Sequence, residues 1–388
     1  MPRSLAVGID IRLIGKQRTG DEVVFFQLVR ELIRRHDTGI RYELYTDETS
    51  DDKLAALRVK LECLGREEVE IVSLPARNRF IWNGLVLPRR LYQHPVDIFH
   101  TQYILPLFWP KQTRVYTHIH DISFRVHPEW VPKRDLLFLS LLIPRTIRRS
   151  DVIIAISEFT KQEILTHYPA SQGKVVVIEN AAAEEWFQPI GESEMNRVLE
   201  RYGLTKQAYL ISSGTMQPRK NIPFLIECFK QAAKRGEFTY PLVLTGNPAG
   251  HNVDGELARG QDEQVRFVGY VSDADLRSLV AGARAYIFPS LYEGFGIPIE
   301  EAIAVGVPVL AADIPAFREV GGDRVTYFDP LSLARAAESL YTFSIARPKP
   351  SLEPAASVGE EYRKKARYSW KKSAEKLFQL YTVGHIDS

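Results

Sequence analysis

Apolar and polar residues along the first half of the chain follow a pattern of short strands separated by helices. Residues 5–11 form an apolar run bounded by charged side chains, which is typical of a buried strand. A loop containing Gly15 and Gly20 follows, and residues 22–35 then carry apolar side chains at helical spacing. Further strands are predicted at 42–45, 70–74, 97–100, 114–119, 152–156 and 175–178, with helices at 133–149 and 158–167. Strands that alternate with helices predict a parallel, doubly wound sheet.

The same alternation restarts in the second half of the chain. An apolar run at 209–213 precedes a loop containing glycine and proline, and a helix is predicted at 222–235. Additional strands are predicted at 242–245, 265–268, 285–288, 307–311 and 326–328, and a last helix from about 358 to 381 with a break near Tyr368. We therefore expect two Rossmann-like α/β domains, 1–190 and 191–367, joined near residues 186–205.

Composition supports two domains and narrows the class of protein. A single core rarely extends beyond about 250–300 residues, and this chain has 388. Hydrophobic residues at 45% and charged residues at 25% are typical of a soluble globular protein, and neither a membrane span nor a signal peptide is expected. Cys63 and Cys228 are predicted to be buried thiols of a reducing cytoplasm. A net charge of +2 argues against nucleic acid as a partner.

Residues 291–302, LYEGFGIPIEEA, are the most informative stretch for chemistry. They follow a predicted strand, and Gly294 and Gly296 would let backbone N–H groups approach a ligand closely. Pro298 suits the first turn of a helix, whose N-terminus would favour a phosphate. The stretch therefore predicts a ligand-binding loop that leads into a helix.

Two carboxylates in this stretch are eight residues apart, Glu293 in the loop and Glu301 inside the helix. Carboxylates only accept hydrogen bonds, so they match the hydroxyls of a sugar or a ribose. The alternative is that Glu300 and Glu301 merely stabilise the positive end of the helix dipole. The glycine-rich loop together with the carboxylate spacing favours a binding site.

A second candidate loop, residues 214–221 (GTMQPRKN), follows the predicted strand at 209–213. Arg219 and Lys220 are adjacent cations that could neutralise a diphosphate through charge-assisted hydrogen bonds. The alternative is a solvated basic loop. Its place at the carboxyl end of a strand favours the binding role, because ligands of doubly wound sheets bind at that end.

Residues 117–121, THIHD, place His118 and His120 on one side of a predicted strand, with His120 and Asp121 at its end. A histidine pair in a strand is more often structural than catalytic. The position of His120 at the strand end keeps both interpretations open.

Asp273 and Asp275 are spaced like the DxD motif that binds metal ions, but we reject this interpretation. Ser272 is a good N-cap, and acidic residues are favoured in the first turn of a helix, which explains the pair without a metal. Cys, His and carboxylate residues elsewhere lack ligand spacing, so no metal site is predicted.

Two segments of the first half, 77–90 and 133–149, combine basic residues with leucine and aromatic residues. An ordinary core helix is the favoured interpretation of 133–149. The alternative is a surface that docks on anionic lipid headgroups.

Taken together, these segments resemble family 4 of the retaining GT-B glycosyltransferases, and the likeness covers nearly the whole chain. Glu293 and Glu301 match the E-x7-E signature of that family, and His120 and Asp121 match its His-Asp pair. Residues 8–12, 150–160 and 177–180 also match, although 18–22 read RTGDE where members often have a Gly-Ile-Gly run. Residues 213–221 resemble the branch that contains bacterial mannosyltransferases of surface-polysaccharide assembly.

The resemblance implies a role for each matching residue. Glu301 would bind the donor ribose, Glu293 the donor sugar together with the backbone of Phe295 and Gly296, and His120 the transferred sugar. The implied catalytic residues are His120, Glu293, Arg219 and Lys220. The implied donor-binding residues are Gly20, Gly214, Arg219, Lys220, Gly294, Phe295, Gly296, Ile297 and Glu301, with Arg219, Lys220 and Gly20 at the diphosphate.

The implied function is a retaining transfer of a hexose from a nucleotide-diphosphate sugar to a glycan or a lipid-linked glycan. No metal and no other cofactor are expected. GDP-mannose is the favoured donor, while UDP-glucose and a deoxysugar nucleotide remain alternatives. A nucleotide-sugar epimerase of the same fold and a non-catalytic sugar-nucleotide-binding subunit are the rival functions.

The resemblance also implies where parts of the chain lie. The C-terminal helix, residues 368–388, is expected to cross back onto the first domain, and the two domains are expected to face a cleft. Independently of the resemblance, the two thiols predict a cytoplasmic protein, and the basic segments 77–90 and 133–149 motivate the hypothesis of peripheral contact with an anionic inner membrane face.

Overall fold

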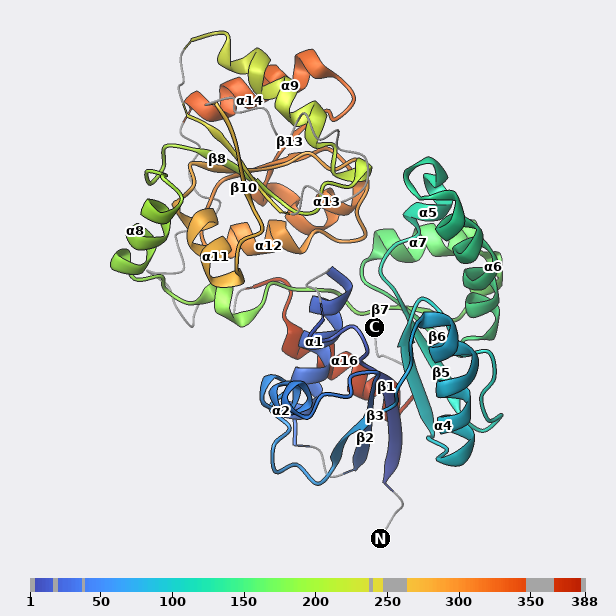
Figure 1. Ribbon diagram of the computed structural model, residues 1–388. Coiled ribbons are helices and arrows are strands. Elements are labelled where there is room, and N and C mark those ends of the chain that lie inside the picture. Colours follow the sequence, from blue (N-terminus) through green and yellow to red (C-terminus); the bar gives the residue numbers. More distant parts are fainter. Residues whose placement is uncertain are drawn as a thin grey trace. The chain divides into compact units, whose positions relative to one another are not determined.

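A computed structural model describes residues 4–16, 20–36, 39–236, 240–246, 264–346 and 366–384. The chain divides into two compact units, the first made of Met1–Asn180 with Tyr368–Ser388 and the second of Ala181–Arg367. Each unit contains one sheet of parallel strands with helices packed against it (Figure 1). Within the described residues, no helix is both long and apolar enough to span a bilayer.

The division falls after Asn180, not at the expected residue 190. The short helix η4 (Glu184–Phe187) packs against the second unit, and its Trp186 and Phe187 side chains are buried. Arg277 of the second unit also donates a hydrogen bond to the carbonyl of Glu185. These contacts assign residues 181–190 to the second unit.

The first unit has a seven-stranded sheet in the order β3-β2-β1-β4-β5-β6-β7. Its strands are β1 (Leu5–Asp10), β2 (Ile40–Thr46), β3 (Val69–Ser73), β4 (Ile98–Gln102), β5 (Arg114–Ile119), β6 (Val152–Ala155) and β7 (Val175–Val177). All of its strand pairs are parallel. The strand order reverses between β1 and β4, and in such sheets the reversal marks where ligands bind.

Helices of the first unit pack on this sheet around two clusters of buried side chains. One cluster includes Trp82 and Phe99, and the other includes Ile119 and Ile147. The helices are α1 (Gly20–Arg34), α2 (Asp51–Lys60), α3 (Arg79–Ile81), the π-helix η1 (Trp82–Val86), α4 (Leu87–Gln93), α5 (Ser123–Val126), η2 (Pro128–Trp130), α6 (Lys133–Arg149), α7 (Glu158–His167), η3 (Pro169–Ser171) and α16 (Trp370–Thr382). Gly20, expected in the loop before the first helix, is instead the first residue of that helix.

The C-terminal helix α16 belongs to the first unit, as the resemblance implied. It packs against α1, where the Arg35 guanidinium lies 4.2 Å from the ring centre of Phe378 and forms an ion pair with Glu375. Lys376 pairs with Glu179 at 2.7 Å, which ties the helix to the end of the continuous part of the unit. The predicted start near residue 358 lies outside the described residues.

The second unit has a six-stranded sheet in the order β10-β9-β8-β11-β12-β13, again all parallel. Its strands are β8 (Leu210–Ser213), β9 (Leu242–Thr245), β10 (Val265–Gly269), β11 (Ala285–Phe288), β12 (Val309–Ala312) and β13 (Thr326–Phe328). Its helices are η4, α8 (Glu192–Arg201), η5 (Pro218–Lys220), α9 (Ile222–Ala233), α11 (Asp273–Gly282), α12 (Ile297–Ala304), α13 (Pro315–Gly321), η6 (Gly322–Arg324) and α14 (Leu333–Ile345). The strand order reverses between β8 and β11.

Candidate functional site

The two candidate loops of the second unit leave the sheet at its topological reversal. Residues 214–221 follow β8 and residues 289–296 follow β11, the neighbouring strand. A backbone hydrogen bond of 2.8 Å from the Leu291 N–H to the Arg219 carbonyl joins the loops. The second unit therefore brings together the two stretches that the sequence singled out, at the edge where such sheets bind ligands.

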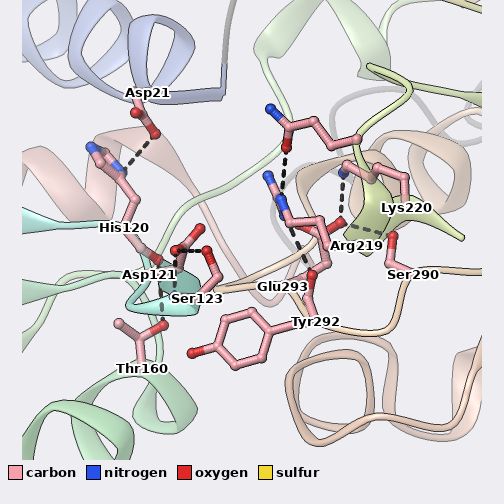
Figure 2. Close-up of polar contacts among 11 residues, drawn as sticks. Asp21, His120, Asp121, Ser123, Thr160, Arg219, Lys220, Ser290, Tyr292 and Glu293 are labelled. Carbon is pink, nitrogen blue, oxygen red and sulfur yellow. Dashed lines mark hydrogen bonds and ion pairs between the residues drawn. The ribbon is translucent and has the colours of Figure 1, made fainter. Parts of the chain in front are cut away.

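An ion-pair cluster links these loops (Figure 2). Arg219 Nη1 lies 2.6 Å from Glu293 Oε2, and Lys220 Nζ lies 2.6 Å from Glu293 Oε1. Ser290 donates a further hydrogen bond of 2.8 Å to Glu293 Oε1. Three of the four residues assigned to catalysis thus lie in direct contact, with Glu293 at the centre.

Charge keeps this cluster ionised. Burial alone would raise the pKa of Glu293, but the charges of Arg219 and Lys220 and the hydrogen bonds around the carboxylate lower it to about 2. At neutral pH the three groups therefore carry one net positive charge. This net positive charge suits the cluster to an anion such as a phosphate group.

Residues that support the cluster carry no recognisable sequence signal of their own. Gln217 accepts a 2.9 Å hydrogen bond from Arg219 Nε and so orients the guanidinium. Tyr286 and Ser213, on β11 and β8, share a hydrogen bond of 2.7 Å below the loops. Gln217 and Ser290 do lie within or beside the candidate stretches, so only their position could have indicated them.

Glycines let the loops of the second unit approach one another. Gly214 and Gly246 both have positive φ, at 136° and 127°. A Cβ on Gly246 would lie 2.0 Å from the Gly214 carbonyl oxygen, closer than any side chain allows. Gly296, with φ of 111°, caps helix α12, and a Cβ there would lie 3.0 Å from the ring of Phe317. The backbone of both candidate loops therefore depends on glycine.

The two glutamates of α12 have different environments. Glu300 is buried and pairs with Arg324 at 2.5 Å, so its role is structural. Glu301 is also buried. Burial raises the pKa of Tyr286, and the negative charge of Glu301 raises the same pKa further. The Glu301 carboxylate therefore interacts electrostatically with Tyr286. The ribose role of Glu301 remains a prediction.

The rest of this loop fits the predicted pattern. Pro298 lies in the first turn of α12, and the Phe295 side chain is buried beneath the loop. Gly294 directly precedes Phe295, and Ile297 directly precedes Pro298. The sequence therefore located this turn correctly, while contacts of its backbone with a ligand stay predictions.

In the first unit, His120 lies at the end of β5 and is buried (Figure 2). Its Nε2 is 2.8 Å from Gln102 Oε1 at the end of β4. Because a carboxamide oxygen only accepts hydrogen bonds, His120 Nε2 is the donor in this contact. Within the described part of the chain Nδ1 has no hydrogen-bond partner, and Asp21 Oδ1 in the first turn of α1 is 3.9 Å away. Gln102 was not predicted, because a lone glutamine at a strand end carries no motif.

Behind His120 lies a column of neutral histidines. The His118 ring stacks on His120 with 5.2 Å between centroids, as strand alternation predicted, and on His100 with 5.5 Å. Burial lowers the pKa of His100 to about 3 and that of His118 well below its ordinary value. His100 Nδ1 lies 2.5 Å from the hydroxyl of Tyr381 on α16. His118 is therefore structural, and His120 is the member of the pair that ends the strand.

Gly20 begins α1 directly before Asp21, and its position is exposed. A Cβ on Gly20 would meet no atom within 4 Å, so nothing in the described residues requires glycine there. The helix start lies near His120 through Asp21, but an approach of Gly20 to a diphosphate stays a prediction.

Among the described residues, no group of three or more His, Cys, Asp or Glu side chains could hold a metal ion. The DxD-like pair behaves as expected, because Ser272 caps α11 by accepting a hydrogen bond from the Asp275 N–H at 3.2 Å. Asp275 also forms an ion pair with Arg201 at 2.7 Å. Both cysteines are free and buried, as predicted.

Two family models match the chain, one in each half. The model described as Glycosyltransferase Family 4 matches residues 18–185, and the model described as Glycosyl transferases group 1 matches residues 197–344. The first range lies almost wholly in the first unit and the second range in the second unit.

Curated relatives and solved structures agree with these models. The chain is 36% identical over 222 residues to O-antigen chain mannosyltransferase B of Escherichia coli, covering 56% of this chain and 58% of that protein. It is 27% identical over 219 residues to O-antigen chain mannosyltransferase RfbU of Salmonella typhimurium, covering 55% of this chain and 56% of that protein. The chain thus spans less than three-fifths of the length of these relatives.

The solved structure of Anabaena Alr3699/HepE in complex with UDP-glucose superposes with a TM-score of 0.70 at 16% identity, covering 98% of this chain and all of that one. This likeness shows the fold, a two-domain GT-B architecture. Through its two matched domains, the chain belongs to the GT-B glycosyltransferases that join a Glycosyltransferase Family 4 domain to a Glycosyl transferases group 1 domain.

Proposed function

We propose that this chain transfers a hexose, with mannose favoured, from a nucleotide-diphosphate sugar to a glycan or a lipid-linked glycan. The observation that carries the proposal is the Arg219–Glu293–Lys220 cluster at the reversal point of the second sheet. Mannosyltransferase names among the relatives support the choice of sugar and a role in O-antigen assembly. GDP-mannose is accordingly the proposed donor.

The cluster acts on the leaving group in this proposal. Negative charge grows on the departing diphosphate as the bond to the sugar breaks, so fixed cations stabilise the transition state more than the bound donor. Arg219 and Lys220 supply those cations, and Glu293 keeps them in place before the donor arrives. The oxygens of Glu293 accept hydrogen bonds and so suit sugar hydroxyls. Separately, Nδ1 of His120 has no hydrogen-bond partner among the described residues.

Retention of configuration and independence from metal are further parts of the proposal. A diphosphate oxygen on the face that the leaving group vacates could accept the proton of the attacking acceptor hydroxyl, which would retain the configuration. Because the two cations offset phosphate charge, turnover should persist in excess EDTA. Loss of all activity in EDTA, with recovery on adding Mn²⁺ or Mg²⁺, would overturn metal independence and leave the transferase assignment intact.

A thermal-shift screen with GDP, UDP, dTDP and ADP tests donor binding. A ligand that binds only the folded chain stabilises it by about 2.7 kcal/mol at a hundredfold excess over Kd. We expect GDP to give the largest shift and the Lys220→Ala variant to reduce it. No shift with any of the four nucleotides would contradict the proposed donor site.

Turnover of labelled GDP-mannose separates the rival functions. A transferase moves label to an added mannan acceptor or, slowly, to water. An epimerase converts GDP-mannose to a second nucleotide sugar without an acceptor. A binding subunit shows the thermal shift and no turnover.

A further inference from the structure

The first unit exposes large apolar side chains on three segments, residues 77–93, 104–111 and 133–149, which together are called the basic apolar surface. Its most exposed members, at 43% to 66% of full exposure, are Phe80, Leu85, Tyr92, Leu107, Phe108, Leu137 and Leu141. Leu137 and Leu141 are one turn apart on α6, so their side chains project from the same face of the helix. The favoured expectation of a core helix holds for the second half of α6, where Ile143 and Ile147 are buried, and the first half adds the partly buried Leu139 to the same core cluster.

Contacts between the three segments make this one continuous surface. The rings of Phe80 and Phe138 meet edge to face with centroids 5.0 Å apart. Arg79 pairs with Asp135 at 2.8 Å, which fixes the first segment to the start of α6. The Leu107 N–H donates to the carbonyl of Asn83 at 2.8 Å. Segments far apart in sequence are therefore held side by side.

Buried anchors hold the exposed side chains outward. Trp82 lies on the same helical stretch as Phe80 and Leu85 but is fully buried, and its indole N–H donates to Asp10 Oδ2 at 3.0 Å. Arg145, which is half-buried on α6, donates to the Leu107 carbonyl at 2.6 Å and so ties residues 104–111 to that helix. The exposure is therefore built into the packing of the unit.

Charge on these segments is almost entirely positive. They contain ten arginines and lysines and a single carboxylate, Asp135, which Arg79 already neutralises. The whole chain has a net charge of +2, so these segments carry +9 and the remainder −7. Lys133, Arg134 and Arg148 are exposed and form no ion pair within the described residues. A partner of this surface must offer uniform negative charge.

We propose that the basic apolar surface docks on a bilayer that contains anionic phospholipid. Exposed apolar side chains that lie among cations can insert at the level of the headgroups, while the cations bind lipid phosphates. A bilayer presents one sign of charge over an apolar layer, which matches this surface. An apolar patch rimmed by charge is otherwise unusual on a soluble domain. Attachment is peripheral and reversible.

Vesicle co-sedimentation of the full chain tests the proposal. Vesicles of phosphatidylcholine alone and vesicles that also contain phosphatidylglycerol are the two arms. We expect sedimentation with the anionic vesicles only, falling by at least about tenfold in high salt as ions screen the headgroups. Equal binding to both vesicles, or binding to neither, would overturn the proposal and leave a protein partner as the better account of the surface.

Matched variants distinguish a specific role of the basic apolar surface from general effects of charge and of exposed apolar side chains. Leu137→Ser with Leu141→Ser should abolish insertion, and Arg148→Gln with Arg149→Gln should weaken binding to the anionic vesicles. Controls are Val59→Ser with Leu64→Ser, which are as exposed but lie outside the surface, and Lys371→Gln with Lys372→Gln, which remove the same charge from α16. Equal loss in the control pairs would show that the surface has no special role.

Failure of this proposal can be told apart from failure of the proposed transferase function. The substituted side chains are exposed, so folding should survive, which urea unfolding checks. The thermal shift with GDP depends on the second unit and should be unchanged in all four variants. Vesicle binding and nucleotide binding are therefore separate measurements.

Discussion

The charged cluster of the second unit consists of two cations, Arg219 and Lys220, and one carboxylate, Glu293. Arg219→Ala and Lys220→Ala should each lower kcat by about 10²–10³, the usual effect of removing one fixed charge stabiliser. Both side chains are mostly buried and pair with the buried Glu293, so each substitution should also lower the free energy of unfolding, and urea unfolding must show that the variants stay folded. Steady-state turnover of GDP-mannose measures the effect, with the exposed Arg197→Ala as a control. Near-normal kcat in both variants would remove the cluster from the mechanism.

The low pKa of Glu293 makes a second prediction at the same scale. Its pKa is about 2 in the folded chain against an ordinary value of 4.5. A carboxylate whose pKa falls on folding stabilises the folded state above its unfolded pKa and loses that contribution as pH falls toward the folded one. The native chain should therefore have a higher urea midpoint than the Glu293→Gln variant. This difference should be constant near neutral pH and shrink below pH 4.5.

Urea titrations at several pH values check this directly. An advantage that already shrinks between about pH 7 and 6 would mean that another group titrates with the substitution, since a carboxylate with a lowered pKa cannot protonate there. Ser290→Ala is a useful comparison, because it removes one hydrogen bond from Glu293 and keeps both ion pairs.

At the scale of elements, the loops after β8 and β9 touch through their backbones. Gly246→Ala should displace the Gly214 loop, because the new Cβ would lie 2.0 Å from the Gly214 carbonyl oxygen. Gly236→Ala is the matched control, since it also has positive φ but meets no atom within 4 Å. Its cost should be only the strain of that backbone conformation, about 1–2 kcal/mol.

Nucleotide binding distinguishes the two glycine variants. Gly246→Ala should lose the thermal shift with GDP, whereas Gly236→Ala should keep it at a lower starting melting temperature. Equal nucleotide shifts in both variants would show that the contact between Gly246 and Gly214 does not shape the loop.

Elements with a clear period were predictable from the sequence, and those without one were not. Strands β5 and β11 and helices α6 and α7 have the predicted bounds, because their apolar residues follow one period between charged ends. The helical stretch from Arg79 to Gln93 was missed because Phe80 and Leu85 face outward and a π-helix interrupts the spacing. Helix α8 was taken for a joining segment, since only one narrow face of it is buried.

Some residues of the candidate site could likewise be predicted from the sequence, and others could not. Arg219, Lys220 and Glu293 were predictable, because loops after neighbouring strands of a doubly wound sheet meet at one edge. Their mutual ion pairing was not, since a sequence does not show which side chains within a loop cluster neutralise one another. Gln102 could not be predicted either, because its role arises from the pairing of β4 with β5.

At the scale of the whole chain, the first unit is discontinuous. Helix α16 completes its core, burying Trp370, Leu377, Leu380 and Tyr381 after the entire second unit has intervened. A chain that ends at Arg367 would lose these side chains and the hydrogen bond from Tyr381 to His100. We expect this variant to lose the folded first unit while the second unit still responds to GDP.

Limited proteolysis with mass spectrometry checks the truncation. The first 180 residues should become sensitive to protease, and the continuous second unit should remain resistant. A chain that ends at Gly384 keeps α16 and serves as the control. Protection of the first unit without α16 would show that its core closes by itself.

The same discontinuity sets an order of events during protein synthesis. The nascent first 180 residues emerge from the ribosome without the helix that covers α1, whereas residues 181–367 emerge as one uninterrupted stretch. At about 5–20 residues per second, translating the rest of the chain takes on the order of 10–40 s. Throughout that interval the apolar face of α1 lacks its cover and is a substrate for chaperones, so the half made first is the last to reach its native state.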